Sequence, residues 1–327
     1  QIKTEHAAAG AAAEKPHRLL TARPPRAEHF TGRQPELTRL LSMLHPARAA
    51  TLVAVGGMGK TALAVEALHH LPDDRFPDGI FFHTFYHQPQ AAICLEHICR
   101  AFGVEPRPDP AQVASILLAE RRALLVLDGA EQADDLRPIL NAAGACGVLI
   151  TTRRRSDAPD FEHFIELTPL PDEQSLSLLQ QWGADCAGDA QAGQAVIRIT
   201  GGLPLAVRLA GRYLRAQNQP AAEYLAWLGT TPLEALDQGR RQLESVPLLL
   251  ARSLAALPEG SRELLGLLGA LAYAPLPLEL LEPALALPAT QQQRLLAGLL
   301  DYGLLLRRAP DDPTVELAHQ LVHTYAS

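Results

Sequence analysis

Over residues 29–170, short apolar runs alternate with longer segments in which apolar residues recur every three or four positions. Short apolar runs are typical of buried parallel strands, and the longer segments have the period of amphipathic helices. The alternation therefore predicts an α/β domain with a parallel sheet. Its strands are expected at 51–55, 79–85, 122–128, 147–153 and 163–170.

After Pro171 the strand pattern stops, and residues 171–236 are predicted to form a small helical domain. In residues 237–327, the periodicity predicts several helices followed by a strand, an Asp/Pro turn and a second strand, in GLLLRRAPDDPTVELAH. Helices followed by such a hairpin are typical of a winged-helix domain. Residues 1–28 contain Ala, Gly and Pro without an apolar period, which predicts a flexible tail or linker.

Composition and charge narrow the possible partners. The net charge of −7 argues against a nucleic acid or an anionic membrane as the main partner. The longest uncharged stretch considered, Leu264 to Leu278, contains two prolines and is too short to cross a bilayer. The four cysteines have no disulfide or zinc spacing, so we expect reduced thiols in a cytoplasmic protein.

A glycine-rich turn separates the first predicted strand from the next helix. The octet from Ala54 to Thr61 matches the phosphate-loop pattern Gly-x-x-x-x-Gly-Lys-Ser/Thr, except that alanine stands first. Glycines allow backbone N–H groups to point at phosphate oxygens, Lys60 can reach the β- and γ-phosphates, and Thr61 can bind Mg²⁺. A chance glycine-rich turn is the alternative, which the flanking strand and helix disfavour. We therefore predict that ADP or ATP, with Mg²⁺, is held by Gly56, Gly57, Met58, Gly59, Lys60, Thr61 and Ala62.

An aspartate, Asp128, ends the third predicted strand in RRALLVLDGAEQ. Its carboxylate can hold Mg²⁺ directly or through water. A strand-end aspartate can also cap a helix, but the metal role is favoured beside a phosphate loop. Hydrolysis also needs a group that activates water. Since Gly129 cannot supply it, the nearby acid Glu131 is the candidate base, and we expect slow hydrolysis.

A polar residue and a cation, Thr152 and Arg153, end the fourth predicted strand in GVLITTRRR. Arginine binds phosphate in a bidentate manner, so these two residues are candidate sensors of the γ-phosphate. The alternative is a solvated basic loop, and that interpretation is preferred for Arg154 and Arg155.

Six segments occur in a recognisable order: HFTGRQPEL, VGGMGKTALA, LLVLDGAE, LITTR, GGLPLA and LAHQLVHTYA. Together they resemble the NB-ARC family, within the STAND class of signal-transduction NTPases. The resemblance covers about residues 28–327, and it implies nucleotide-binding, helical and winged-helix domains in that order.

The resemblance also implies roles for single residues. Phe30, Thr31, Gly32 and Arg33 match the segment that lines the adenine and ribose, and Pro204 matches a proline that packs on the adenine. His319 matches the histidine of a Met-His-Asp motif, which contacts the β-phosphate of ADP. The motif reads Ala318-His319-Gln320 here, so the Met and the Asp are absent. We therefore expect the latch, which is the contact of this histidine with ADP that holds the closed state, to be weaker than in relatives with the Asp. The alternative for His319 is a buried structural histidine.

Family resemblance implies a switch: an ADP-bound closed monomer opens and self-associates when ATP replaces ADP, and effector and sensor domains lie outside this chain. A DNA-associated ATPase or transcriptional regulator with a winged helix is the alternative. From Asp237 onward there are seven Arg and no Lys against ten Asp and Glu, which makes nucleic acid an unlikely partner. A small-molecule kinase is a third possibility, for which the sequence offers neither an acceptor pocket nor a base.

Overall fold

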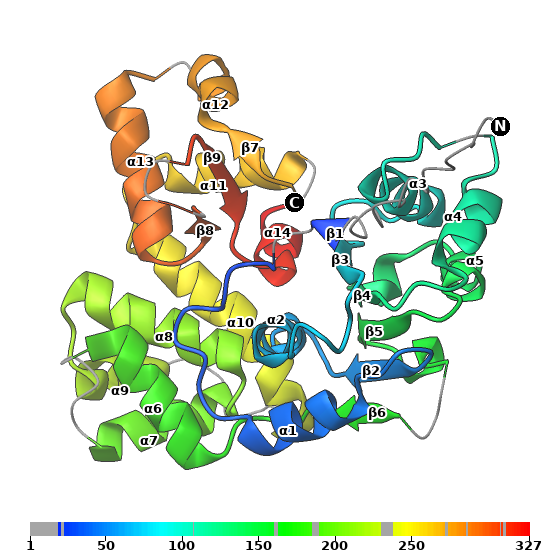
Figure 1. Cartoon of the computed structure of the whole chain (residues 1–327). Coiled ribbons are helices and arrows are strands. Elements are labelled where there is room, and N and C mark those ends of the chain that lie inside the picture. The colour runs from blue at the N-terminus through cyan, green and yellow to red at the C-terminus, as the bar shows by residue number, and fades with distance from the viewer. Residues whose placement is uncertain are drawn as a thin grey trace, which may run out of the picture.

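The computed structural model (Figure 1) describes residues 19–20, 23–106, 108–159, 163–184, 190–229, 238–271, 274–285, 287–307, 309 and 312–327. The predicted boundary between residues 236 and 237 lies outside these ranges, as does Cys186. Three parts are visible: a sheet with helices on both sides, a helical part at the lower left, and a C-terminal part at the upper left. In this view the helix α2 is drawn at the centre of the picture.

A parallel sheet forms the first part, as the alternation of apolar runs predicted. The strand order is β1-β3-β4-β5-β2-β6. Every residue of β4 and β5 is buried, which explains why these segments read as continuous apolar runs. The strands are β1 (Leu19–Leu20), β2 (Ala49–Val53), β3 (Gly79–Thr84), β4 (Leu124–Asp128), β5 (Gly147–Thr152) and β6 (Phe164–Glu166).

Helices cover both faces of this sheet (Figure 1). Side chains alternate between faces along a strand, so Val126 of β4 packs in the core beneath α1 and α2, while Leu125 and Leu127 pack beneath α3, α4 and α5. These helices are α1 (Gln34–Met43), α2 (Lys60–His70), α3 (Ala91–Ala101), α4 (Pro110–Leu118) and α5 (Arg137–Ala142). Two 3₁₀ turns follow strand ends, at Ala130–Gln132 and Arg155–Asp157.

The second part is helical, as predicted. A bend separates α7 from α8 at Gly201 and Gly202, which have positive φ values of 60° and 66°. A β-carbon on Gly202 would lie 2.5 Å from the carbonyl oxygen of Leu170, so only glycine fits this turn. The helices are α6 (Asp172–Gly183), α7 (Ala190–Thr200), α8 (Pro204–Gln217) and α9 (Ala221–Gly229).

The C-terminal part combines helices with a small antiparallel sheet of order β7-β9-β8. The predicted hairpin is confirmed, because Leu305 of β8 pairs with Leu317 of β9. A short helix, α14, follows the hairpin. The elements are α10 (Gln238–Ala255), α11 (Ser261–Ala270), β7 (Leu276–Pro277), α12 (Leu278–Leu285), α13 (Ala289–Asp301), β8 (Leu305–Leu306), β9 (Thr314–Leu317) and α14 (Gln320–Ala326).

One apolar core runs through all three parts. It joins Leu63 of α2 to Leu209 of α8 and to Val322 of α14, all fully buried. The interface also has polar contacts: Arg212 of α8 donates to the Leu300 carbonyl and lies over the Trp182 ring, 4.7 Å from its centroid. The three parts are therefore packed against each other rather than merely linked.

Residues 23–28 belong to the predicted tail, but they are bound to the rest of the structure. Arg23 donates to Asp73 at 3.0 Å, Arg26 lies 3.6 Å from Glu66 on α2, and Glu28 lies 3.9 Å from Arg212 on α8. These contacts are ionic, so apolar periodicity gave no sign of them. In Figure 1 this dark-blue segment runs from β1 toward α1.

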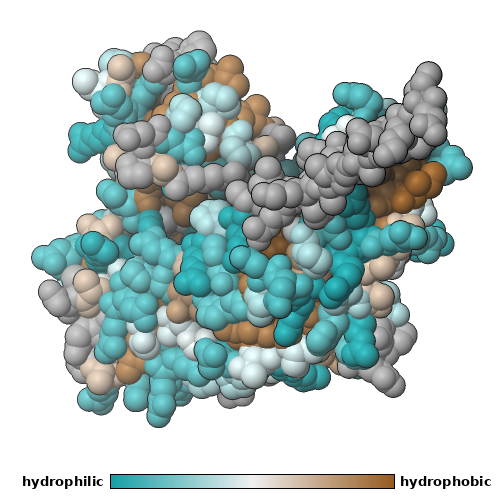
Figure 2. All heavy atoms as spheres, in the orientation of Figure 1, coloured by the Kyte–Doolittle hydropathy of each residue, from teal (hydrophilic) through white to brown (hydrophobic). Residues whose placement is uncertain are grey.

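The face drawn in Figure 2 is mostly hydrophilic, with hydrophobic residues in scattered patches. Over the described residues, no helix combines the length and the apolar character that crossing a membrane would require.

Candidate nucleotide site

The phosphate loop joins β2 to α2. Gly57 and Gly59 have φ values of 79° and 91°, which glycine adopts without strain. Lys60 is the first residue of α2, is 5% exposed, and donates from Nζ to the carbonyls of Ala54 (2.8 Å) and Val55 (3.2 Å). Burial lowers the pKa of Lys60 to about 8, and Glu131 opposes this shift. The ammonium group is thus held inside the loop, where a phosphate could replace the carbonyls as its partner.

A carboxylate and two hydroxyls meet beside the start of α2. Thr61 and Thr151 each donate from Oγ1 to Oδ1 of Asp128, both at 2.7 Å. Thr151 also accepts from the N–H of Gly129 at 2.9 Å. Burial raises the pKa of Asp128, so a bound cation would stabilise its charged form.

Thr61 and Asp128 offer the hard oxygen ligands that Mg²⁺ prefers. In the part of the chain that the structure describes, no group of three or more His, Cys, Asp or Glu residues could hold a metal by itself. The residues present fit a cation that takes only one or two ligands from the protein and shares the phosphates of a nucleotide.

Glu131 and Arg153, predicted as base and sensor, bind each other. Nε of Arg153 lies 2.9 Å from Oε1 of Glu131, and the N–H of Arg153 donates to Oε2 at 3.2 Å. Tyr86 donates its hydroxyl to Oε1 at 3.0 Å. The Arg153 guanidinium also faces the loop, 3.2 Å from where a β-carbon on Gly56 would lie. Arg153 thus connects the phosphate loop with Glu131.

Thr152 points elsewhere. It is buried, donates to Oδ2 of Asp157 at 2.5 Å, and accepts from the N–H of Arg154 at 3.0 Å. These bonds hold the 3₁₀ turn after β5. Alternation along the strand explains the outcome, because neighbouring residues face opposite sides and Thr151 is the one directed at Asp128.

The helical part contacts the loop through the segment GGLPLA. The N–H of Leu205 donates to the carbonyl of Gly57 at 3.2 Å, and a β-carbon on Gly57 would lie 3.0 Å from Cβ of Leu205. Pro204, the first residue of α8, immediately precedes this contact. The predicted adenine-packing proline therefore lies close to the phosphate loop.

Residues 30–33 lie between the loop and α6. Arg33 is 4% exposed and donates to the carbonyls of Thr168 (2.5 Å) and Met58 (3.5 Å). Thr31 accepts from Gln181 on α6 at 3.1 Å. A β-carbon on Gly32 would lie 2.0 Å from Oε1 of Gln174, and Phe30 packs against the shared core. The segment predicted to line the adenine and ribose is thus placed beside the loop.

His319 caps α14 and comes close to the site. Its Nδ1 accepts from the N–H of Leu321 at 3.0 Å. Burial, followed by the charges of Arg208, Arg153 and Lys60, lowers the pKa of His319 to about 3. The ring is therefore neutral near pH 7, and since Nδ1 accepts, the proton resides on Nε2.

The helix behind His319 also contacts the loop. A β-carbon on Gly56 would lie 3.4 Å from Cδ1 of Leu321. The structure therefore brings together residues from α2, β4, β5, α8 and α14, while half-buried Ala62 follows on α2. Thr151, Tyr86 and Leu205 were missed as site residues. Thr151 and Leu205 stand within the motifs LITTR and GGLPLA, whereas Tyr86 had no signal in the sequence.

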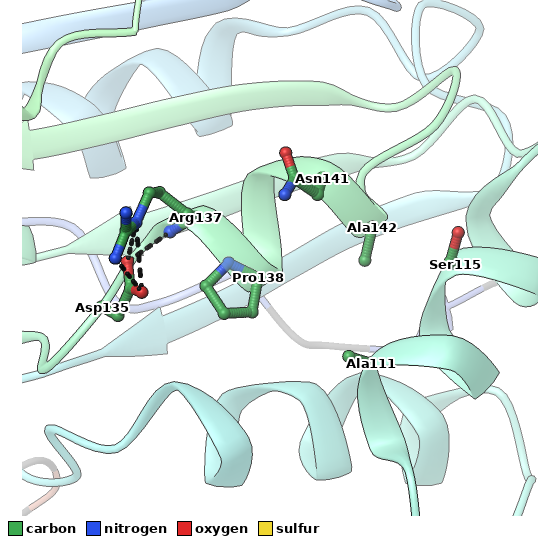
Figure 3. Close-up of a pocket in the computed structure, with 7 residues that line it drawn as sticks. All are labelled: Ala111, Ser115, Asp135, Arg137, Pro138, Asn141 and Ala142. Carbon is green, nitrogen blue, oxygen red and sulfur yellow. Dashed lines mark hydrogen bonds and ion pairs between the residues drawn. The ribbon is translucent and has the colours of Figure 1, made fainter.

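A separate hollow of about 500 Å³ lies between α4 and α5 (Figure 3). Its charged residues, Asp135 and Arg137, pair with each other at 2.9 Å. None of the residues predicted to bind nucleotide lines it. The full lining is Ala111, Ser115, Asp135, Arg137, Pro138, Asn141 and Ala142.

No family model matches the chain. The chain is 28% identical over 319 residues to the regulatory protein AfsR of Streptomyces coelicolor, covering 91% of this chain and 32% of the relative. For AfsR of Streptomyces griseus, the identity is 31% over 214 residues, covering 60% and 22%. A nucleotide-binding leucine-rich-repeat-like protein of Hyaloscypha variabilis is 24% identical over 285 residues, covering 72% and 28%. The chain spans about a third or less of these relatives.

Among solved structures, the chain is similar to a signal transduction ATPase with numerous domains from Pyrococcus horikoshii, which carries a tetratricopeptide repeat sensor. The TM-score is 0.61 at 17% identity, covering 93% of this chain and 43% of the other. At this level of identity the likeness is one of fold. The fold, the order of the motifs and the relatives all point to the same class of proteins, the nucleotide-binding signalling ATPases.

Proposed function

The chain belongs to the NB-ARC and STAND family of P-loop NTPases, and we propose that it is a molecular switch controlled by bound ADP or ATP. The observation that carries this proposal is that the helical and C-terminal parts both contact the phosphate loop. Leu205 lies against Gly57, and Leu321 lies against Gly56. A ligand in the loop therefore lies where it can stabilise one arrangement of the three parts over another.

The residues at the loop suit a nucleotide with a cation. Lys60 and the loop N–H groups would hold the β-phosphate, and the N-terminus of α2 would add its positive dipole. Mg²⁺, held by Thr61 and Asp128, would supply positive charge against the phosphate oxygens. Residues 30–33 and Pro204 would hold the adenine and ribose. His319 would donate from Nε2 to the β-phosphate of ADP.

Such a donor would make ADP binding and closure mutually dependent. Lys60, Thr61 and Asp128 belong to the first part and keep their positions whatever the other parts do. His319 belongs to the C-terminal part, so its hydrogen bond exists only while the parts are closed. Ligand and closure then strengthen each other by the same factor. Exchange of ADP for ATP would release the C-terminal part and allow self-association.

The chemistry at Glu131 favours retention of nucleotide over rapid turnover. The candidate base is paired with Arg153 and hydrogen-bonded by Tyr86. We further propose that effector and sensor segments belong to a longer protein, because the relatives extend well beyond the aligned region. A DNA-associated ATPase is the alternative, and the acidic balance of residues 237–327 disfavours it.

Identification of the nucleotide released by denaturing the purified protein tests the proposal. ADP in near-stoichiometric amount supports the switch, and replacement by ATP should expand the molecule in small-angle scattering. An empty site, or nucleotide exchange that leaves the scattering curve unchanged, would refute it. A parallel titration with duplex DNA at several salt concentrations separates the alternative, since phosphate contacts make such binding steeply salt-dependent.

A further inference from the structure

The ring of Tyr86 lies across Gly129, the residue that follows Asp128, the proposed metal-binding carboxylate. A β-carbon on Gly129 would lie 2.7 Å from Cζ of Tyr86 and within 2.9 Å of two further ring carbons. Gly129 has a φ of 72°, so the missing side chain and the unusual backbone occur at the same residue. Any larger residue at position 129 would displace the ring. Tyr86 and Gly129 are thus matched in shape.

The hydroxyl at the end of this ring reaches Glu131. It donates to Oε1 at 3.0 Å, on the same oxygen that lies 2.9 Å from Nε of Arg153. Burial, together with Asp128 and Glu131, raises the pKa of Tyr86 well above its ordinary value, so the hydroxyl remains a donor. Glu131 is 5% exposed, and its second oxygen accepts from the N–H of Arg153.

We propose that Tyr86 is a positioning residue that restrains Glu131 against Arg153 and thereby keeps hydrolysis of a bound nucleoside triphosphate slow. In hydrolysis, a water oxygen bonds to the γ-phosphorus while the bond from that phosphorus to the β–γ bridging oxygen breaks. The electron pair leaves with ADP, and a water proton passes to a base. A carboxylate engaged by both Tyr86 and Arg153 is withheld from that proton. The inference rests on the proposed nucleotide site.

Removal of the hydroxyl alone is the sharpest test. Tyr86→Phe keeps the ring over Gly129 and removes the bond to Glu131. Single-turnover phosphate release from ATP and Mg²⁺ should become about 10- to 100-fold faster, which is the range expected for one hydrogen bond to a charged group. ADP affinity should stay unchanged in calorimetry. Tyr224→Phe is the matched control, because Tyr224 is buried in α9 against Tyr213, 5.1 Å between ring centroids.

The double variant Tyr86→Phe with Glu131→Gln shows whether the faster phosphate release depends on Glu131. If it does, the double variant should hydrolyse ATP at the slow wild-type rate. A looser structure alone would leave the gain in place. A Tyr86→Phe protein that retains ADP but hydrolyses no faster would overturn the proposal, as would a gain that survives in the double variant.

Glu131→Gln alone decides the matter if Tyr86→Phe does not fold. A restrained Glu131 predicts an unchanged slow rate, whereas a large loss would mean that Glu131 already acts as the base and that Tyr86 does not restrain it. The nucleotide content of the wild-type protein is measured first. An empty site refutes the proposed function and this inference together, while a filled site with no gain refutes the role of Tyr86 alone.

Discussion

Replacement of His319 separates a nucleotide latch from a structural cap. Its two nitrogens have different tasks: Nδ1 accepts from the N–H of Leu321, and Nε2 carries the proton available to a phosphate. Asparagine is a good N-cap but cannot place a donor where Nε2 lies. His319→Asn therefore keeps the cap and removes the latch, whereas His319→Ala removes both.

The magnitudes follow from these two bonds. A hydrogen bond to a charged group contributes about 1.5–3 kcal/mol. His319→Asn should therefore lower the affinity for ADP roughly 10- to 100-fold and speed the release of ADP. Loss of an N-cap costs about 0.5–2 kcal/mol, so only His319→Ala should also lower the stability of the nucleotide-free protein.

The release rate of a fluorescent ADP analogue measures the first effect, and thermal unfolding without nucleotide measures the second. If His319→Asn releases ADP at the wild-type rate while His319→Ala lowers stability, His319 is a cap residue and the latch model is wrong.

Three further predictions concern Lys60 and turnover. Lys60→Ala should abolish nucleotide binding in calorimetry, since loss of a buried charged partner costs about 2–5 kcal/mol, and unchanged affinity would mean that the loop is not the site. Because the pKa of Lys60 is lowered to about 8, the nucleotide-free protein loses that proton above this pH. ADP affinity should be flat from about pH 6 to 7.5 and then fall by up to about tenfold per pH unit, and a flat profile through pH 9.5 would contradict the role of Lys60. Steady-state phosphate release should lie well below ordinary turnover of roughly 1–10³ per second, and a rate within that range would exclude a restrained Glu131.

The elements and the loop could be predicted because they depend on local sequence. Each of the five predicted runs overlaps one of the strands β2 to β6, although the run at 163–170 is strand only over Phe164–Glu166. The strand β1 (Leu19–Leu20) was not predicted, because it lies in the predicted tail and pairs with β3. A glycine-lysine-threonine turn between strand and helix has few other uses. The hairpin of β8 and β9 was readable from its Asp/Pro turn. The bound segment of residues 23–28 was not, since it is held by single ion pairs from Arg26 and Glu28 that have no period along the chain.

The partners within the site were harder to predict because they depend on how distant segments meet. Glu131 and Arg153 were assigned separate roles, and nothing in the sequence indicates that they pair at 2.9 Å. The only prediction made for Gly129 was that it cannot activate water, because it has no side chain. The contact with Tyr86, 43 positions earlier in the chain, arises from the parallel pairing of β3 with β4.

The position of Gly129 bears on how such a switch is kept slow. Gly129 has no side chain that could act as a base, which by itself would leave Glu131, two residues later, as the base. In this structure the space left by the missing side chain is filled by the Tyr86 ring, whose hydroxyl reaches that acid. Arg153, which faces the phosphate loop, pairs with the same carboxylate, 2.9 Å from the oxygen that accepts from Tyr86. A γ-phosphate that attracted Arg153 would therefore compete with Glu131 for one guanidinium. Release of Glu131 would then depend on the triphosphate itself, while Tyr86 would still oppose it.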